Sequence, residues 1–261
     1  WAHETSGESL PNVLYANTLL SLVLLMLAHH FWLRTWVGTR TALVGGLALG
    51  ALANVLFLTY AHHPYEFWGV AGFCVLLRGV ERGWAWWMLA LLCLVTGLVW
   101  EKHALVPGLG GLLQLPRGTP FLASLWRGLV MLAAALAVPL LLRWQLGGDR
   151  VAFGGLSHLA LQEWDKVLWF QLPYVLPFVG IFVLRGRRMP VWLRLLWLYL
   201  PVIVAAYIAQ AFILHEVRSF WALVPVFTAT LACWLASAAD PALATRDEAS
   251  PDGAAAPPQG T

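Results

Sequence analysis

Charged residues are scarce in this sequence: 11% of its 261 residues are Asp, Glu, Lys or Arg, whereas 60% are hydrophobic. A soluble globular domain carries roughly 25% charged residues, so the composition argues against one. The mean hydropathy is +0.72, and the apolar residues form continuous runs of about 20, the length that crosses a bilayer as a helix. Continuous runs favour helices over the alternating strands of a barrel. We therefore expect an all-α, polytopic membrane protein.

Disulfide and nucleic-acid signatures are missing as well. The three cysteines, Cys74, Cys93 and Cys233, lie inside apolar runs, so we expect packed thiols and no disulfide framework. Basic residues cluster nowhere beyond 185–188, and membrane topology therefore explains the net charge of +3 better than nucleic-acid binding does.

Metal and cofactor motifs are also lacking. The sequence has no glycine-rich nucleotide loop and no His-Glu-x-x-His pattern. His62, His63 and Glu66 could suggest a metal site, but Pro64 interrupts the helical spacing that such a site needs. We expect no metal ligands among these residues, and a cofactor, including a divalent metal, is not identified by any motif.

The two ends of the chain differ from its apolar middle. The chain begins at Trp1 without an initiator methionine or a signal-peptide pattern, and we expect either that an upstream segment was removed or that at least one preceding helix is missing. Residues 240–261 are rich in Ala, Pro and Asp, a composition typical of disorder. The expected organisation is an extracytoplasmic segment at 1–11, a transmembrane domain at 12–238 and a disordered cytoplasmic tail at 239–261.

Proline, glycine and charge clusters divide the transmembrane domain into about eight helices. We expect them at 12–33, 40–61, 66–80, 83–101, 121–143, 165–184, 190–214 and 219–238. Residues 104–115 (ALVPGLGGLLQL) are apolar but too short to cross a hydrocarbon core of about 30 Å at about 1.5 Å per residue. We expect this stretch to be a half-spanning re-entrant segment rather than an extension of the preceding helix.

Basic residues divide unevenly between the two sides of this arrangement. Alternation of the spans from Arg34 and Arg40 places most of the 16 Lys and Arg residues on one side. The opposite side keeps Lys102, Arg143, Arg150, Lys166 and Arg218. Because positive residues accumulate in cytoplasmic loops, we expect a multi-pass protein of the bacterial inner (plasma) membrane with its C-terminal tail in the cytoplasm.

Ionisable residues gather at three places on the extracytoplasmic side. Tyr65-Glu66 opens a short helix, Glu101-Lys102-His103 closes the next one, and His215-Glu216-Val217-Arg218 joins the last two. An ionisable side chain costs roughly 2.5–3.5 kcal/mol at the centre of a membrane helix, so it is usually paired, near water or functional. We expect the three stretches to border one extracytoplasmic cavity.

Each stretch also has a purely structural interpretation. Glu66 would interact with the positive end of its helix. Lys102 would anchor its helix by snorkelling to the headgroups. Glu216 and Arg218 would neutralise each other in a hairpin, whereas in the functional interpretation Arg218 holds a phosphate or carboxylate in bidentate fashion.

At these same places the chain resembles bacterial polytopic proteins related to the GT-C membrane glycosyltransferases. Tyr65-Glu66 matches the aromatic-acid pair that opens a short helix in that group, and Glu216-Val217-Arg218 matches its Glu-x-Arg near the final span. Trp100-Glu101-Lys102-His103-Ala104 matches the group's Asn-Arg/Lys-Glu-Thr-Ala motif in position and in Ala104, with acid and base exchanged and no threonine. The resemblance extends over 40–238 in order and spacing.

The resemblance implies a GT-C-like bundle that transfers a sugar from a polyprenyl-phosphate donor on the extracytoplasmic face. It also implies an acid in the first extracytoplasmic loop, of which residues 1–11 would be the remnant, with Glu4 or Glu8 as that acid. Under this hypothesis the catalytic carboxylates are Glu66 and Glu216. The substrate-binding residues are Glu101, Lys102, His103, His215 and Arg218.

Two other functions fit the same residues. In a non-catalytic lipid-carrier or polysaccharide transport protein, the charges would line a path. In a structural subunit of a membrane complex they would be anchors, and the partner subunits are not named by the sequence. The expected partners of the enzyme are a polyprenyl-phosphate lipid and the membrane lipids.

Overall fold

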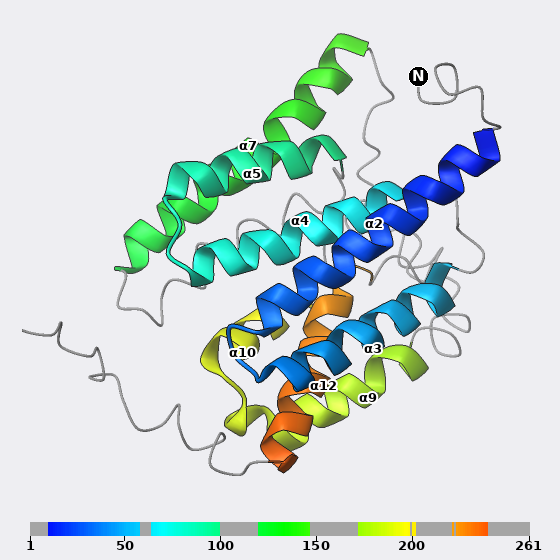
Figure 1. Ribbon diagram of the computed structural model, residues 1–261. Helices are drawn as coiled ribbons and strands as arrows, with labels where there is room; N and C mark the ends of the chain where they lie inside the picture. The colour runs from blue at the N-terminus through cyan, green and yellow to red at the C-terminus, as the bar shows by residue number, and fades with distance from the viewer. Residues whose placement is uncertain are drawn as a thin grey trace, which may run out of the picture.

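The described part of the chain is entirely helical. The computed structural model describes residues 10–57, 64–99, 120–146, 172–198, 200–201, 221 and 223–239. Its helices in chain order (Figure 1) are α2 (Leu10–Leu33), α3 (Thr39–Phe57), α4 (Pro64–Glu81), α5 (Trp86–Val99), α7 (Phe121–Leu146), α9 (Leu172–Arg185), the 3-10 helix η5 (Gly186–Arg188), α10 (Val191–Trp197) and α12 (Val224–Ala239). The all-α prediction is confirmed for these residues.

Several helix ends follow the proline and glycine residues in the sequence. α4 begins with Pro64, which suits the first helical position because no amide hydrogen is needed there. Gly83 has a φ of +68°, a conformation that glycine adopts without strain, and it turns the chain from α4 into α5. Pro190 precedes α10, and its carbonyl accepts the amide of Leu193 at 3.0 Å.

The expected single helix at 190–214 is interrupted by a turn at Leu198, and residues 200–201 are helical again. α10 ends at Trp197, and Leu198 lies in a turn whose amide donates to the carbonyl of Leu195 at 3.1 Å. Pro201 has no amide hydrogen for the carbonyl of Trp197, so the regular bonding of the helix is broken at this point. The remainder of the expected helix, 202–214, lies outside the described residues.

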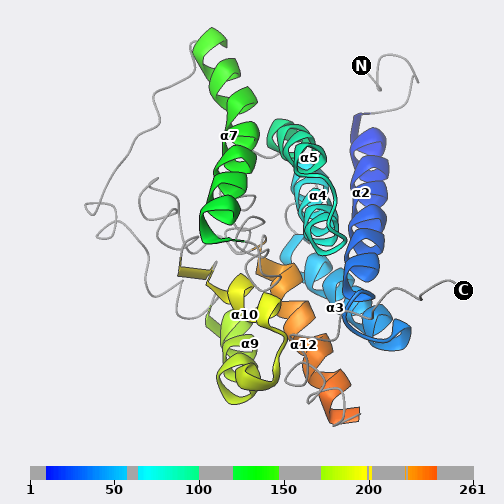
Figure 2. The ribbon, with the colours of Figure 1, turned by 90° about the vertical axis from the view of Figure 1, so that its left-hand side faces the viewer.

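The helices pack in a sequence of neighbours rather than around one central helix. α7 lies along α5, α5 on α4, α4 along α2, α2 on α3 and α3 on α12, which also contacts α9 and α10. Figure 2 shows α7, α5, α4 and α2 as one upright group above α10, α9, α12 and α3. The contact between α2 and α3 therefore connects the two groups.

Small residues allow several of these helices to approach closely. A Cβ added to Gly97 of α5 would lie 2.9 Å from the backbone carbonyl carbon of Ala135 in α7. A Cβ on Gly45 of α3 would lie 2.5 Å from Leu33 and 3.3 Å from the Cβ of Ala232 in α12. Small residues at helix crossings are typical of membrane bundles, where close backbone packing replaces the hydrophobic driving force.

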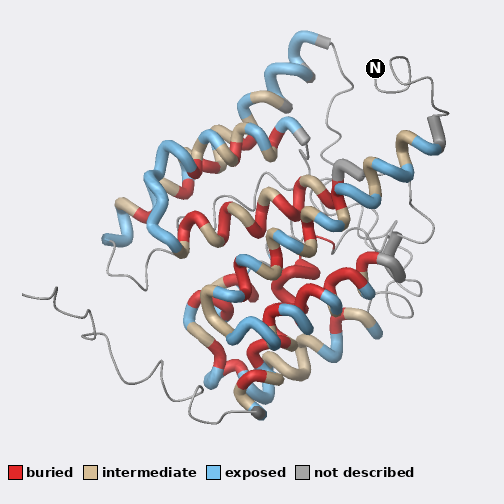
Figure 3. Tube along the Cα trace, in the orientation of Figure 1, coloured by how far each residue is buried: buried red, intermediate tan, exposed pale blue. Residues whose placement is uncertain are grey.

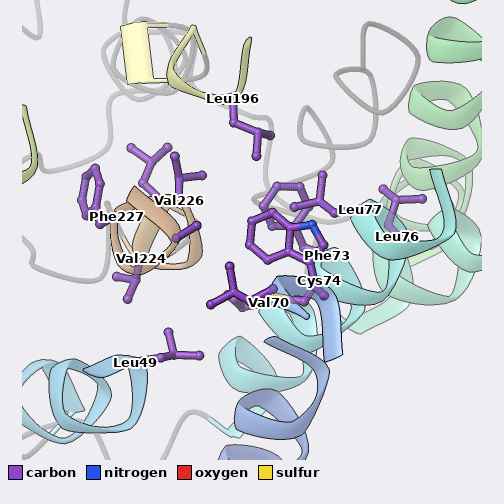
Figure 4. Packing of buried hydrophobic residues seen from close by; sticks show 14 of the residues in the cluster. Leu49, Val70, Phe73, Cys74, Leu76, Leu77, Leu196, Val224, Val226 and Phe227 are labelled. Atoms are coloured by element: carbon purple, nitrogen blue, oxygen red, sulfur yellow. The ribbon is translucent and has the colours of Figure 1, made fainter. Parts of the chain in front are cut away.

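Buried apolar side chains from both groups form one cluster. Figure 4 shows Leu49 of α3, Val70 and Leu77 of α4, Leu196 of α10 and Phe227 of α12 among its members. Each is no more than 3% exposed. The cluster joins helices that are far apart in the sequence.

Two helical stretches, Asn12–Leu33 and Phe121–Leu142, are long and apolar enough to cross a membrane, while Thr39–Ala53, Trp86–Leu98 and Val224–Ala238 are shorter apolar helices. Figure 3 shows that α2, α5 and α7 expose much of their surface, whereas α4 is largely buried. The exposed residues of α2 include one face of large apolar side chains: Leu20, Val23, Leu27 and Phe31. By length and composition, the two longer stretches favour an association with a membrane.

Candidate functional site at the start of α4

Glu66 lies in the first turn of α4 with its side chain only 2% exposed. Pro64 fixes the start of the helix, so the carboxylate is two residues from the first helical position. The unsatisfied amide groups and the helix dipole make this end of the helix favourable for a negative charge. The local sequence therefore places an acid where its own helix stabilises it, inside the protein rather than on its surface.

Trp221 covers the same turn of α4 from the segment that leads into α12. Its indole Nε1 donates to the backbone carbonyl of Glu66 at 3.3 Å. The Trp221 ring meets the ring of Phe67 edge-on, with centroids 5.3 Å apart and planes at 82°. Since Trp221 is fully buried, residues 155 positions apart in the chain are fixed against each other here.

A second indole joins α4 to α2 at the same level. The Nε1 of Trp68 donates to the side-chain oxygen of Asn17 at 3.3 Å. Two tryptophans and one asparagine thus hold the start of α4 between α2 and the start of α12. A buried carboxylate on a helical turn whose backbone is held in this way can accept a proton or a hydrogen bond in a site of defined geometry.

Most of the expected site residues lie outside the described residues. They are Glu101, Lys102, His103, His215, Glu216 and Arg218, together with Glu4 and Glu8, and the re-entrant segment at 104–115 lies outside them too. The convergence of the three charged stretches therefore stays a prediction. What the structure brings together is Glu66 and Trp221, which follows Arg218 by three residues in the sequence.

A buried polar contact that the sequence did not reveal lies between α2 and α12. The Nε2 of His29 is 2.9 Å from the Thr228 hydroxyl and 3.4 Å from the Pro225 carbonyl oxygen, and both side chains are fully buried. Its Nδ1 has no hydrogen-bond partner. The His29 ring also meets Trp32 edge-on at 5.7 Å.

The signal for His29 was present but weak. His29 and His30 interrupt an apolar run in the expected first span, and an ionisable residue inside such a run is a functional candidate by itself. The three charged stretches give a stronger signal than His29 because each has several ionisable or polar residues together at a helix end. Thr228 carries no such signal, because threonine often bonds to its own helix, as Thr228 does with the Val224 carbonyl at 2.9 Å.

Metal binding finds no support in the described part of the chain. There, no group of three or more His, Cys, Asp or Glu side chains could hold a metal ion.

Comparisons of the whole sequence with family models, with curated proteins and with solved structures find no match. The function must therefore be argued from the geometry and the sequence.

Proposed function

We propose that this chain is a multi-pass protein of the bacterial inner membrane. The distribution of polarity supports the proposal. Large apolar side chains are exposed on α2, α3, α5, α7 and α9, whereas six polar side chains of the described residues are buried. The buried ones are Ser21, His29, Glu66, Ser124, Thr228 and Thr230. An apolar exterior of this extent is unfavourable in water, and it is what a lipid environment accommodates.

The arrangement of the arginines supports the proposed orientation. Arg78 near the end of α4 lies over the ring of Phe31 near the end of α2, with its guanidinium carbon 5.1 Å from the centroid. Trp36, in the turn after α2, stacks on Trp192 of α10. These contacts bring three arginine-bearing turns to one end of the bundle, which we assign to the cytoplasm by the positive-inside rule. Glu66, in the first turn of α4, is then extracytoplasmic.

The activity we propose is transfer of a sugar from a polyprenyl-phosphate donor at the Glu66 end. The observation that carries the proposal is the buried Glu66 side chain, on a turn whose backbone carbonyl accepts a hydrogen bond from Trp221. Arg218 precedes Trp221 by three residues, which span at most about 11 Å of extended chain. This short separation in the chain supports the proposal that the carboxylate of Glu66 and the cation of Arg218 act at one site. Glu66 and Arg218 are also two of the residues that carry the GT-C resemblance.

In this reaction Glu66 or Glu216 accepts the proton of the acceptor hydroxyl as its oxygen bonds to the anomeric carbon of the sugar. The bond from that carbon to the phosphate oxygen breaks, and polyprenyl phosphate leaves. Lys102 and Arg218 bind the phosphate and stabilise its charge. Glu101, His103 and His215 contribute further contacts to the substrates.

The experiment is sugar transfer from a labelled polyprenyl-phosphate sugar by the full chain in proteoliposomes. Glu66→Gln keeps the size of the side chain and removes the base, so we expect a loss of 100-fold or more, in line with the roughly 10²–10⁴-fold contribution of a positioned base. The matched control is Glu81→Gln, at the other end of the same helix. Equal activity of Glu66→Gln and the wild type would exclude the proposed role.

Transport is a second candidate because of His29. A fully buried histidine bonded to Thr228 between two apolar helices is the kind of group that lines a path for protons or polar cargo. If transport is the function, His29→Leu abolishes the movement of protons or polar cargo across the membrane of proteoliposomes. In the sugar-transfer assay, Glu66→Gln and the wild type then do not differ. The structural-subunit alternative predicts that neither substitution changes either assay.

A further inference from the structure

Six arginines form an exposed group at the end of the bundle opposite Glu66. They lie in the turn after α2 and the first turn of α3, and at the end of α9, in η5 and in α10. We call them the arginine rim: Arg34, Arg40, Arg185, Arg187, Arg188 and Arg194. All six are exposed, and neither 29–57 nor 172–201 contains an Asp or Glu residue. The rim is therefore a concentrated positive surface with no carboxylate in its own segments.

Stacked tryptophans join the two halves of the rim. Trp36 and Trp192 stack with centroids 4.4 Å apart and planes at 27°, and Trp32 meets Trp192 edge-on at 5.3 Å. Trp36 lies between Arg34 and Arg40 in the sequence, and Trp192 lies between Arg188 and Arg194. The stack therefore places the turn after α2 beside α10, and each of these two segments carries arginines (Figure 1).

The same two indoles have unused hydrogen-bonding capacity. The Nε1 atoms of Trp36 and Trp192 are buried without a hydrogen-bond partner. An unsatisfied buried donor costs roughly 1–3 kcal/mol. A ligand rich in acceptor oxygens, bound beside these rings, would recover part of that energy if the rings shift slightly.

Large apolar side chains are exposed directly beside the arginines. Leu184 is 81% exposed, Val183 is 74% exposed and Leu198 is 56% exposed. Arg185 follows Leu184 immediately, and Arg194 is one helical turn before Leu198. Positive charge and exposed apolar surface thus alternate over a few residues, which matches an amphiphile with an anionic head and apolar tails.

We propose that the arginine rim binds the phosphate headgroup of an anionic phospholipid of the surrounding bilayer. Guanidinium groups bind phosphate oxygens in bidentate fashion, and basic clusters at the cytoplasmic ends of membrane helices attract anionic lipids. The exposed Leu184, Val183 and Leu198 contact the acyl chains of the lipid. A soluble polyanion has no apolar part that could make this contact. This site is distinct from the proposed transfer site, because the rim and Glu66 lie at opposite ends of the bundle.

The test titrates the purified full chain in neutral detergent with phosphatidylglycerol, phosphatidylcholine or inorganic phosphate and counts bound molecules by native mass spectrometry. Each arginine at a membrane surface contributes about 1 kcal/mol, so Arg187→Gln/Arg188→Gln is expected to weaken phosphatidylglycerol binding about 30-fold. The control Arg143→Gln/Arg150→Gln removes the same charge from the side that we assign to the extracytoplasmic face, and its affinity should stay within about threefold of the wild type.

Three outcomes would overturn the proposal. Phosphatidylcholine binding as tight as phosphatidylglycerol binding would remove the role of charge. An equal loss in the control pair would mean that net charge, and no built site, attracts the lipid. Saturation by inorganic phosphate at the same concentration would identify a soluble-anion site. If the Gln pair fails to fold, Arg187→Lys/Arg188→Lys is measured instead: it keeps the charge and should bind within about fivefold of the wild type, whereas a larger loss contradicts the proposal.

Discussion

Substituting Gly97 by alanine tests the close packing of α5 against α7. The added Cβ would lie 2.9 Å from the carbonyl carbon and 3.0 Å from the Cα of Ala135, whereas ordinary contact begins near 3.4 Å. Because the obstacle is backbone, no side chain can rotate away. The two helices must separate by roughly 0.5 Å or more, which sacrifices about a quarter of the dispersion energy of the contacts that open.

Overpacking of this kind costs about 1–3 kcal/mol. The control is Gly180→Ala in α9, where an added Cβ meets nothing within 4 Å. Alanine in a helix interior is favoured over glycine by about 1 kcal/mol, so the control should be neutral or stabilised. Both variants gain this helix propensity, so they differ by the cost of overpacking. At about 2–4 °C per kcal/mol, Gly97→Ala should melt about 2–12 °C below Gly180→Ala.

Thermal unfolding of the two variants in the same detergent, followed by circular dichroism or size-exclusion chromatography, measures this difference. Apparent melting temperatures suffice because both variants are compared under one protocol. If Gly97→Ala is as stable as Gly180→Ala, the close approach of the two helices is wrong.

Two further predictions concern the α2–α12 contact and the orientation. Thr228→Val removes the hydroxyl 2.9 Å from the His29 Nε2 and should destabilise the protein by about 1–2 kcal/mol. The control Ser237→Ala is on the same helix, where the hydroxyl donates to the Trp234 carbonyl, and should have little effect. Equal melting temperatures of the two variants would contradict the contact between Thr228 and His29. Arg187→Cys should react with a membrane-impermeant maleimide only after the cells are permeabilised. The background should be low because the native cysteines are buried. Labelling in intact cells would show that the orientation of the chain in the membrane is the opposite of the proposed one.

Much of the helical framework could be predicted from the composition and from the proline, glycine and charged residues that separate the apolar runs. Expected helices at 12–33 and 121–143 correspond closely to α2 and α7, because an apolar run bounded by polar residues or proline leaves little choice of boundary. The separation of α9 from α10 was also expected, from the arginines at 185–188. The turn at Leu198 was missed, although Pro201 carried the signal: a proline ends a helix about one turn before itself.

The site was less predictable because it depends on tertiary contacts. The sequence singled out Glu66 as an acid in an apolar context, but nothing local indicates that Trp221 bonds to its carbonyl. His29 and Thr228 meet across 199 positions, a separation that no periodicity encodes. Likewise, Gly97 and Ala135 are ordinary small residues until the two helices cross.

The central claim is that the Glu66 end binds a polyprenyl phosphate. The most direct measurement is native mass spectrometry of the purified full chain after incubation with polyprenyl phosphate, compared with Lys102→Gln/Arg218→Gln and with the control Arg78→Gln/Arg82→Gln at the opposite end of the bundle. We predict one bound lipid in the wild type and in the control. In the Lys102 and Arg218 double variant the affinity should fall about 30-fold if each cation contributes about 1 kcal/mol. A wild-type chain that binds no polyprenyl phosphate, or a double variant that binds it equally well, would contradict the account.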